Sequence, residues 1–189
     1  MKTCRTLFTG LFLTYLSLSA LGVLAQSYCI PTATYGNTFY VGHVIFGSID
    51  RSNYPDQNYN DLTALSTTVS DCGTQTIYVE CDQLIPATRL PMANVYCAGF
   101  IDFNDDGDFS DAGEEIFEYV PTLYTLQSST FVVPQNVPNS TLRLRVMCVY
   151  ASGSGINPCG TFDYGETEDY TVIISRSIPT PVIKIGRAH

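Results

Sequence analysis

Short runs of β-branched and aromatic residues, separated by Gly, Pro, Asn and Asp, recur along the chain after residue 28. No apolar stripe of helical period and helical length occurs beyond residue 25, which argues against a helical fold. Strands are predicted near residues 41–49, 74–80, 94–103, 130–133, 141–150 and 169–175. Short strands with turn signals between them predict an all-β fold, an antiparallel β-sandwich of jelly-roll or immunoglobulin-like type.

The run at residues 141–150 shows the clearest alternation. Its even-numbered positions from 142 to 148 are apolar, whereas Arg143 and Arg145 lie between them. In a strand these two sets face opposite sides of the sheet. Residues 94–103 are apolar on both faces, which is typical of a central strand.

The amino terminus has the pattern of a Sec-type signal peptide. Lys2 and Arg5 precede an apolar run over residues 7–23, which ends in the small residue Ala25. We expect residues 1–25 to be removed and the mature protein to be secreted or held at the cell surface. A retained transmembrane anchor is the alternative interpretation.

The rest of the chain divides into a domain and a tail. Residues 26–176 are the expected folded domain, and residues 177–189 form a linker or truncated tail. The ending at residues 185–189 is similar to the translation of a sequencing adapter. We therefore expect the natural protein to continue with downstream domains, which are candidate partners of this one.

Charge limits the possible partners. The net charge is −9 and the nine Lys and Arg residues are scattered, so no basic patch for nucleic-acid phosphates or anionic lipid can form. We expect no nucleic-acid binding, and no membrane association once the signal peptide is removed.

Six cysteines remain after cleavage, an even number that predicts up to three disulfides in an exported chain. They are Cys29, Cys72, Cys81, Cys97, Cys148 and Cys159. A strand between Cys72 and Cys81 would hold them roughly 30 Å apart, so these two should not pair. Without CxxC pairs, and with His43 as the one histidine in the body of the chain, a structural zinc site is not expected.

An acidic stretch dominates residues 102–118, where eight acidic residues occur without a basic one. It begins with the DxNxDG spacing of calcium loops, in which oxygen side chains converge on one cation and Gly allows a sharp turn. The predicted Ca²⁺ ligands are Asp102, Asn104, Asp106, Asp108, Asp111 and Glu114. The alternative is a solvated acidic turn that binds nothing.

The match to an EF-hand is incomplete. Position 12 of the loop, where a bidentate Glu would close the site, is Gly113, and the flanking sequence is not helical. The closing ligand must come from Asp111, Glu114, Glu115 or another part of the fold.

A second motif stands at residues 165–169, Gly-Glu-Thr-Glu-Asp. It resembles the string that gives the GEVED domain its name, with Thr167 in place of the usual Val. Residues 100–114 resemble the acidic block of that family, and residues 142–146 resemble its Arg-hydrophobic-Arg-Val strand. The resemblance covers nearly all of residues 28–175. It implies a β-sandwich module of exported bacterial proteins, often beside peptidase, fibronectin-like or type IX secretion sorting domains. We expect an adhesion, accessory or spacer role for such a module.

The carboxylates of this string have a predicted role. On a strand, Glu166 and Glu168 share one face and Asp169 points to the other. We hypothesise that one carboxylate completes the calcium shell and that another, Glu168 or Asp169, pairs with Arg145 or Arg143.

No HExxH, GxSxG or Walker string is present, and His43 lies in an alternating strand, so we expect a non-catalytic module. One alternative is a carbohydrate-binding module that presents Tyr54 and Tyr59 to a cell-surface glycan. These tyrosines could equally pack a loop onto the domain. Another alternative is an accessory domain of a secreted peptidase or other hydrolase.

Overall fold

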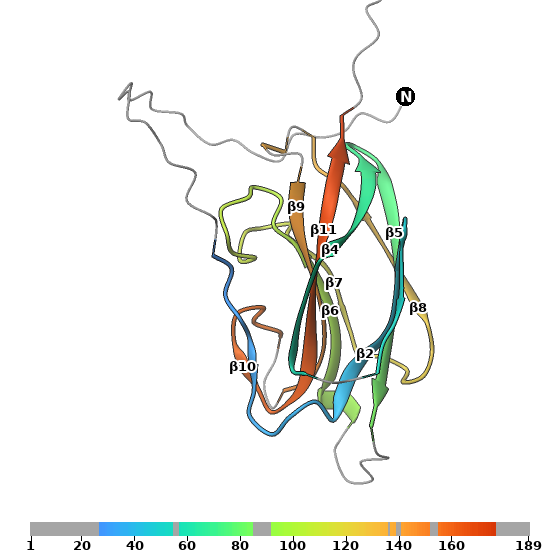
Figure 1. The fold of residues 1–189 in the computed structure, drawn as a ribbon, viewed down its shortest axis with the longest axis vertical. Coiled ribbons are helices and arrows are strands. Elements are labelled where there is room, and N and C mark those ends of the chain that lie inside the picture. Colours follow the sequence, from blue (N-terminus) through green and yellow to red (C-terminus); the bar gives the residue numbers. More distant parts are fainter. Residues whose placement is uncertain are drawn as a thin grey trace, which may run out of the picture.

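The computed structural model describes residues 27–54, 57–84, 92–135, 137–138, 141–151 and 155–176. These residues are almost entirely strands and connecting loops (Figure 1). The elements are β1 (Thr32–Ala33), β2 (Phe39–Phe46), β3 (Ile49–Ser52), β4 (Tyr59–Ser70), β5 (Thr74–Gln83), the 3₁₀ turn η1 (Met92–Asn94), β6 (Val95–Ile101), β7 (Glu115–Tyr119), β8 (Gln127–Val132), β9 (Thr141–Tyr150), β10 (Thr161–Phe162) and β11 (Tyr164–Ser175).

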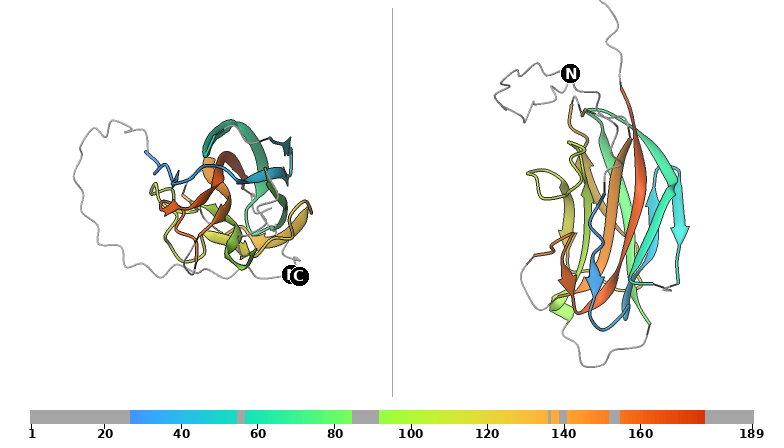
Figure 2. Two further views of the ribbon diagram at one scale, coloured as in Figure 1. Left: turned by 90° about the horizontal axis from the view of Figure 1, so that it is seen from below. Right: turned by 60° about the vertical axis from the view of Figure 1, so that its left-hand side comes forward.

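Two large sheets pack face to face, which confirms the predicted all-β sandwich (Figures 1 and 2). One has the order β4-β11-β9-β6-β7, and the other has the order β3-β2-β5-β8. The expectation of purely antiparallel pairing needs a correction, because β4 runs parallel to β11. Their wide separation in sequence leaves ample chain for the crossover that parallel neighbours require.

The core between the sheets follows the alternation of β9. Its even-numbered side chains, including Leu144 and Cys148, lie in this core, whereas Arg143 and Arg145 lie on the opposite face, as predicted. Strand β6 occupies the predicted central position between β9 and β7.

A smaller apolar cluster covers the outer face of the five-stranded sheet. Phe100 and Met147 from that sheet pack there against Phe109 and Phe162, with Tyr28 beside them. Strands β1 and β10 pair with each other next to this cluster, and they lie beside the larger sheet in Figure 1. The outward-facing side chain of Arg145 is therefore fully covered by protein, whereas that of Arg143 stays partly exposed.

Two predicted boundaries differ from the structure. The predicted strand 41–49 is a hairpin, because Gly47 adopts a φ of 58° and turns the chain between β2 and β3. The polar stretch at residues 52–61, which carries Tyr54 and Tyr59 and is expected to be a loop, enters β4 at Tyr59. The sequence of β4 shows little apolar alternation, so hydrogen-bonded pairing with β11, rather than the residue pattern, accounts for this strand.

The cysteines divide into two groups. Cys29 and Cys159 form a disulfide between the amino-terminal segment and the loop before β10. Cys72, Cys81, Cys97 and Cys148 are not joined by disulfides in the structure, and the last three lie in the core, so one of the up to three expected disulfides is present among the described residues. Cys72 and Cys81 are not joined to each other, as predicted.

The predicted signal peptide at residues 1–25 and the predicted tail at residues 177–189 lie outside the described residues. Among the residues that are described, no helix has the length and apolar character needed to cross a membrane.

Candidate metal centre

The acidic loop joins β6 to β7, and a buried carboxylate closes it at each end. Asp102 is fully buried directly after β6. Its carboxylate accepts hydrogen bonds from the backbone N–H groups of Asp106 (3.2 Å) and Gly107 (2.9 Å) and from the hydroxyl of Tyr28 (2.7 Å). Gly107 has a φ of 97°, the left-handed conformation that the DxNxDG turn requires of its glycine.

Glu114 lies at the other end, directly before β7, and is only 2% exposed. Its carboxylate accepts backbone N–H hydrogen bonds from Phe103 (3.0 Å) and Asp111 (3.3 Å). Burial, with the nearby Asp102 carboxylate adding to it, raises the pKa of Glu114 to about 7. Asp102 and Glu114 therefore hold the loop in shape through its backbone.

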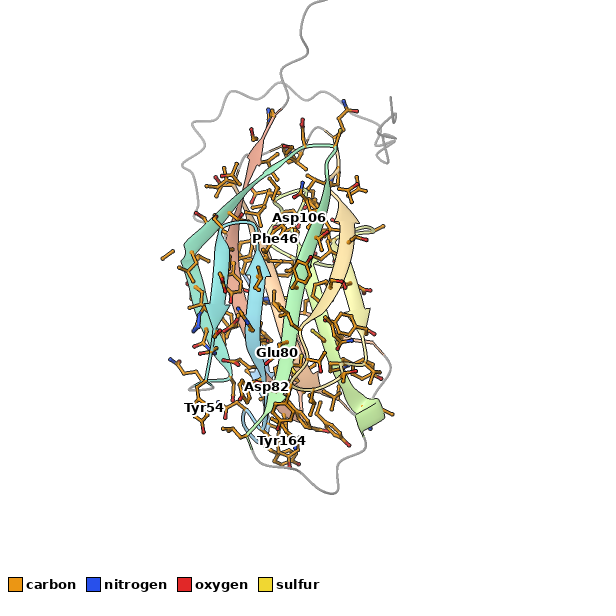
Figure 3. The ribbon with its side chains drawn as sticks, turned by 90° about the vertical axis from the view of Figure 1, so that its right-hand side faces the viewer. Phe46, Tyr54, Glu80, Asp82, Asp106 and Tyr164 are labelled. Carbon is orange, nitrogen blue, oxygen red and sulfur yellow. A yellow bond between two sulfur atoms is a disulfide. The ribbon has the colours of Figure 1, made fainter. Side chains whose placement is uncertain are left out.

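Three exposed carboxylates gather between these ends. The oxygens of Asp106, Asp108 and Asp111 lie within 4.8 Å of one another. The Asn104 amide donates to Asp106 (3.0 Å) and also to Asp111, so it lies between two members of the cluster. None of the three carboxylates forms an ion pair within the described part of the chain. The cluster could hold a metal ion, and Figure 3 shows Asp106 toward one end of the sandwich.

The structure thus divides the six predicted ligands into two sets. Asp106, Asp108 and Asp111 come together, and their carboxylate oxygens fit a hard cation. Asn104 turns its amide N–H toward Asp106 and Asp111, while its side-chain oxygen accepts the backbone N–H of Asp106. The carboxylate oxygens of Asp102 and Glu114 instead accept backbone N–H groups and a tyrosine hydroxyl. The sequence spacing alone could not distinguish the carboxylates that shape the loop from those that face solvent.

The string at residues 165–169 lies on β11, and its last carboxylate forms the predicted ion pair. Asp169 stands directly opposite Arg145 on β9. The Arg145 guanidinium donates to both Asp169 oxygens at 2.8 Å, and Arg143 adds a third hydrogen bond at 3.2 Å. Asp169 and Arg145 are both fully buried.

Glu166 and Glu168 face the other way, into the space between the sheets. Glu166 accepts hydrogen bonds from the Asn53 side chain (3.0 Å), from the Asn60 side chain and from the backbone N–H of Val41 (3.0 Å). These contacts give no support to the hypothesis that one of these carboxylates completes the calcium shell, which stays a prediction. Strand alternation directs them into the sandwich, whereas the acidic loop packs on the outer face.

Glu168 has a similar set of partners. It accepts hydrogen bonds from Asn53 (3.1 Å) and from the Tyr170 hydroxyl, and Arg51 lies 3.9 Å away. No pattern in the sequence marks Asn53 and Asn60, because their hydrogen bonds to Glu166 and Glu168 form only when segments distant in the chain become neighbours.

The acidic loop and the buried string are linked through the two arginines. Arg145 also donates to the carbonyl oxygens of Cys29 (2.8 Å) and Pro158 (2.7 Å), next to the disulfide, and lies 4.7 Å from the centre of the Phe109 ring. Arg143 lies 4.4 Å from the centre of the Tyr28 ring, whose hydroxyl bonds to Asp102. The connection between the two motifs is thus made of cation–π contacts and hydrogen bonds.

The tyrosines proposed as a glycan platform have different neighbours. The Tyr59 hydroxyl donates to Asp169 (2.9 Å), and the ring lies 5.9 Å from the Arg145 guanidinium. Tyr54 is 73% exposed and lies beside Tyr40, toward the end of the sandwich away from Asp106 (Figure 3). This arrangement gives no support to a platform built from the two rings together.

Comparison with known families adds one finding. Residues 96–173 match the model of the GEVED domain. The matched region runs from β6 to β11 and contains both the acidic loop and the buried string. This confirms the resemblance drawn from the two motifs. No curated protein matches the chain.

Proposed function

Because the chain contains a GEVED domain, we propose that it is a non-catalytic, calcium-stabilised β-sandwich module of an exported or cell-surface protein. Its role would be that of a spacer, adhesion or accessory module beside other domains. The observation that carries the proposal is the group of three exposed aspartates, Asp106, Asp108 and Asp111, within 4.8 Å of one another.

Electrostatics favours a cation at this cluster. Three carboxylates at such short range repel one another, and the hydrogen bonds from Asn104 neutralise none of their charge. Ca²⁺ accepts about six to eight oxygen ligands in a flexible cage, so an exposed site of three aspartates completed by water suits it. When bound, the ion would supply the positive charge that the loop lacks.

The position of the loop explains how such an ion would stabilise the fold. Phe109 lies within the loop and packs in the outer apolar cluster, next to the Arg145 guanidinium. Fixing the neighbouring aspartates would hold this ring over the buried ion pair. The ion would thereby strengthen the outer layer of the sandwich.

Two observations support export and a non-catalytic role. The Cys29–Cys159 disulfide is typical of proteins that fold in an oxidising compartment. His43 pairs with the exposed Asp50 (2.7 Å) across the β2–β3 hairpin, and no side-chain hydrogen bond described for either residue joins it to a candidate nucleophile.

The test is thermal and chemical unfolding of the protein in about 5 mM CaCl₂ and in excess EDTA. Extracellular calcium modules bind at roughly 0.1–1 mM, so ligand linkage predicts a stabilisation of about 1–2 kcal/mol. The double variant Asp106→Asn/Asp108→Asn should lose this stabilisation.

Glu115→Gln is the matched control. It removes one negative charge from the same acidic stretch, outside the cluster, and should keep the calcium effect. If wild-type protein shows no shift with calcium, the acidic stretch is a bare surface and the calcium part of the proposal is overturned.

A further inference from the structure

Three buried cysteines from three strands meet in the core between the sheets. Cys97 on β6 and Cys148 on β9 stand directly opposite each other on neighbouring strands. Cys81 reaches them from β5 in the opposing sheet, and its thiol hydrogen-bonds with both. All three are at most 1% exposed.

The contacts distinguish the two possible partners of Cys81. Cys97 stands opposite Tyr119 on β7, and the Tyr119 hydroxyl hydrogen-bonds with its thiol. The side-chain hydrogen bond of Cys148 is to Cys81. Cys97 therefore has Tyr119 as a second partner besides Cys81, whereas the side-chain partner of Cys148 is Cys81.

We propose that Cys81 and Cys148 form a disulfide that joins the two large sheets, and that Cys97 remains a thiol. The oxidant is a protein or small-molecule disulfide of the export compartment. The Cys81 thiolate attacks one sulfur of that disulfide and forms a mixed disulfide. The first attack breaks the S–S bond of the oxidant and frees one of its sulfurs as a thiolate. The Cys148 thiolate then attacks the Cys81 sulfur and frees the second, so the oxidant is reduced to two thiol groups that carry the two electrons. The two cysteine protons pass to solvent or to the released thiols.

This reaction belongs to folding rather than to the finished domain. Complete burial raises the pKa of the Cys81 thiol and closes the path to an oxidant, so the thiols react before the sheets close. The same burial then shields the bond from reductants. Cys29–Cys159 lies at the outer layer, so the buried bond would be the one that ties the two main sheets together.

The test is peptide mapping of the whole chain, produced in an oxidising compartment or refolded with oxidised glutathione. The protein is denatured in an alkylating reagent without reduction, digested and analysed by mass spectrometry. The Cys29–Cys159 peptide pair reports that oxidation took place. We expect a linked Cys81–Cys148 peptide pair and alkylated Cys97. Alkylation of both Cys81 and Cys148 in molecules that contain the Cys29–Cys159 bond would overturn the proposal.

Variants that each replace one cysteine by serine test which two cysteines are joined. The Cys81–Cys148 link should persist in Cys97→Ser and disappear in Cys148→Ser. If Cys81 instead becomes alkylated in Cys97→Ser, the bond runs to Cys97 and the proposed pairing is wrong. The calcium experiment does not depend on these cysteines, so either proposal can fail alone.

Discussion

The exposed cluster of the acidic loop and the buried acidic string each contain three carboxylates, but the fold treats them in opposite ways. In the loop, Asp106, Asp108 and Asp111 are exposed and lie close together, without an ion pair among the described residues. In the string, Glu166, Glu168 and Asp169 are fully buried, and each accepts hydrogen bonds from side chains elsewhere in the fold. Exposed charge can be neutralised by an ion from solution, whereas buried charge requires partners within the protein.

The partners of the two groups also come from different parts of the chain. The loop is shaped mainly by its own backbone, and from outside it Tyr28 donates to the Asp102 carboxylate and the Arg143 carbonyl accepts the Asp102 backbone N–H. The string depends on Val41, Asn53 and Asn60, which precede the region matched by the family model. The buried carboxylates of the family motif therefore need residues upstream of the matched region as hydrogen-bond donors.

The largest effect should follow from removing those strands. A fragment of residues 96–176 keeps every predicted cation ligand, but it loses β2, β3 and β5, three of the four strands of one sheet. Without a facing sheet its core is exposed, and Glu166 loses its hydrogen bonds from Val41 on β2 and Asn60 on β4. We expect no cooperative unfolding transition by circular dichroism. A cooperative transition in this fragment would show that the matched region folds independently.

Breaking the buried ion pair comes next. Arg145→Met leaves Asp169 charged and buried without its bidentate partner, which should cost about 3–5 kcal/mol. Arg143→Met is the matched control, because Arg143 makes one hydrogen bond to the same carboxylate and is partly exposed. Urea unfolding at pH 7 measures the loss in free energy of unfolding for both variants. Equal losses in the two variants would contradict a special role for Arg145.

A paired experiment separates the two acidic groups directly. Glu168→Gln should lower the free energy of unfolding by about 1–3 kcal/mol, because its neighbours lose a charged acceptor, and should leave calcium affinity unchanged. Asp106→Asn should do the reverse, with weaker calcium binding and little change in stability in EDTA. Calorimetric titration and urea unfolding report the two quantities. Weaker calcium binding in Glu168→Gln would show that the string at residues 165–169 contributes to the ion site.

The smallest expected effect is a pH dependence from Glu114. Its folded pKa of about 7 lies above its usual value, so its contribution to stability is fully present below about pH 4.5 and is lost as the pH rises through 7. In EDTA, the stability of wild type relative to Glu114→Gln should therefore fall between about pH 5 and pH 7. Unfolding in urea across this range measures the difference. A relative stability that rises with pH would mean that the folded loop favours the charged form of Glu114.

Much of this arrangement was predictable because it depends on local patterns. The alternation in residues 141–150 placed the two arginines opposite the core, and the position of Asp169 on its strand directed it toward them. The DxNxDG spacing predicted a turn directly after the strand at residues 94–103, where the acidic loop begins, although strand β7 after the loop was not predicted. The motif at residues 165–169 identified the family. Each of these follows from residue order within one element.

The sequence by itself therefore determined the all-β class, the position of the acidic loop and the pairing of the string with an arginine. Only the tertiary structure decided which carboxylates stay exposed. It also placed Asn53 and Asn60 on Glu166, set β4 parallel to β11 and brought Cys81 to Cys148. The physical reason is that periodicity and spacing act along a single strand. Burial and the neutralisation of charge depend instead on which distant strands become neighbours.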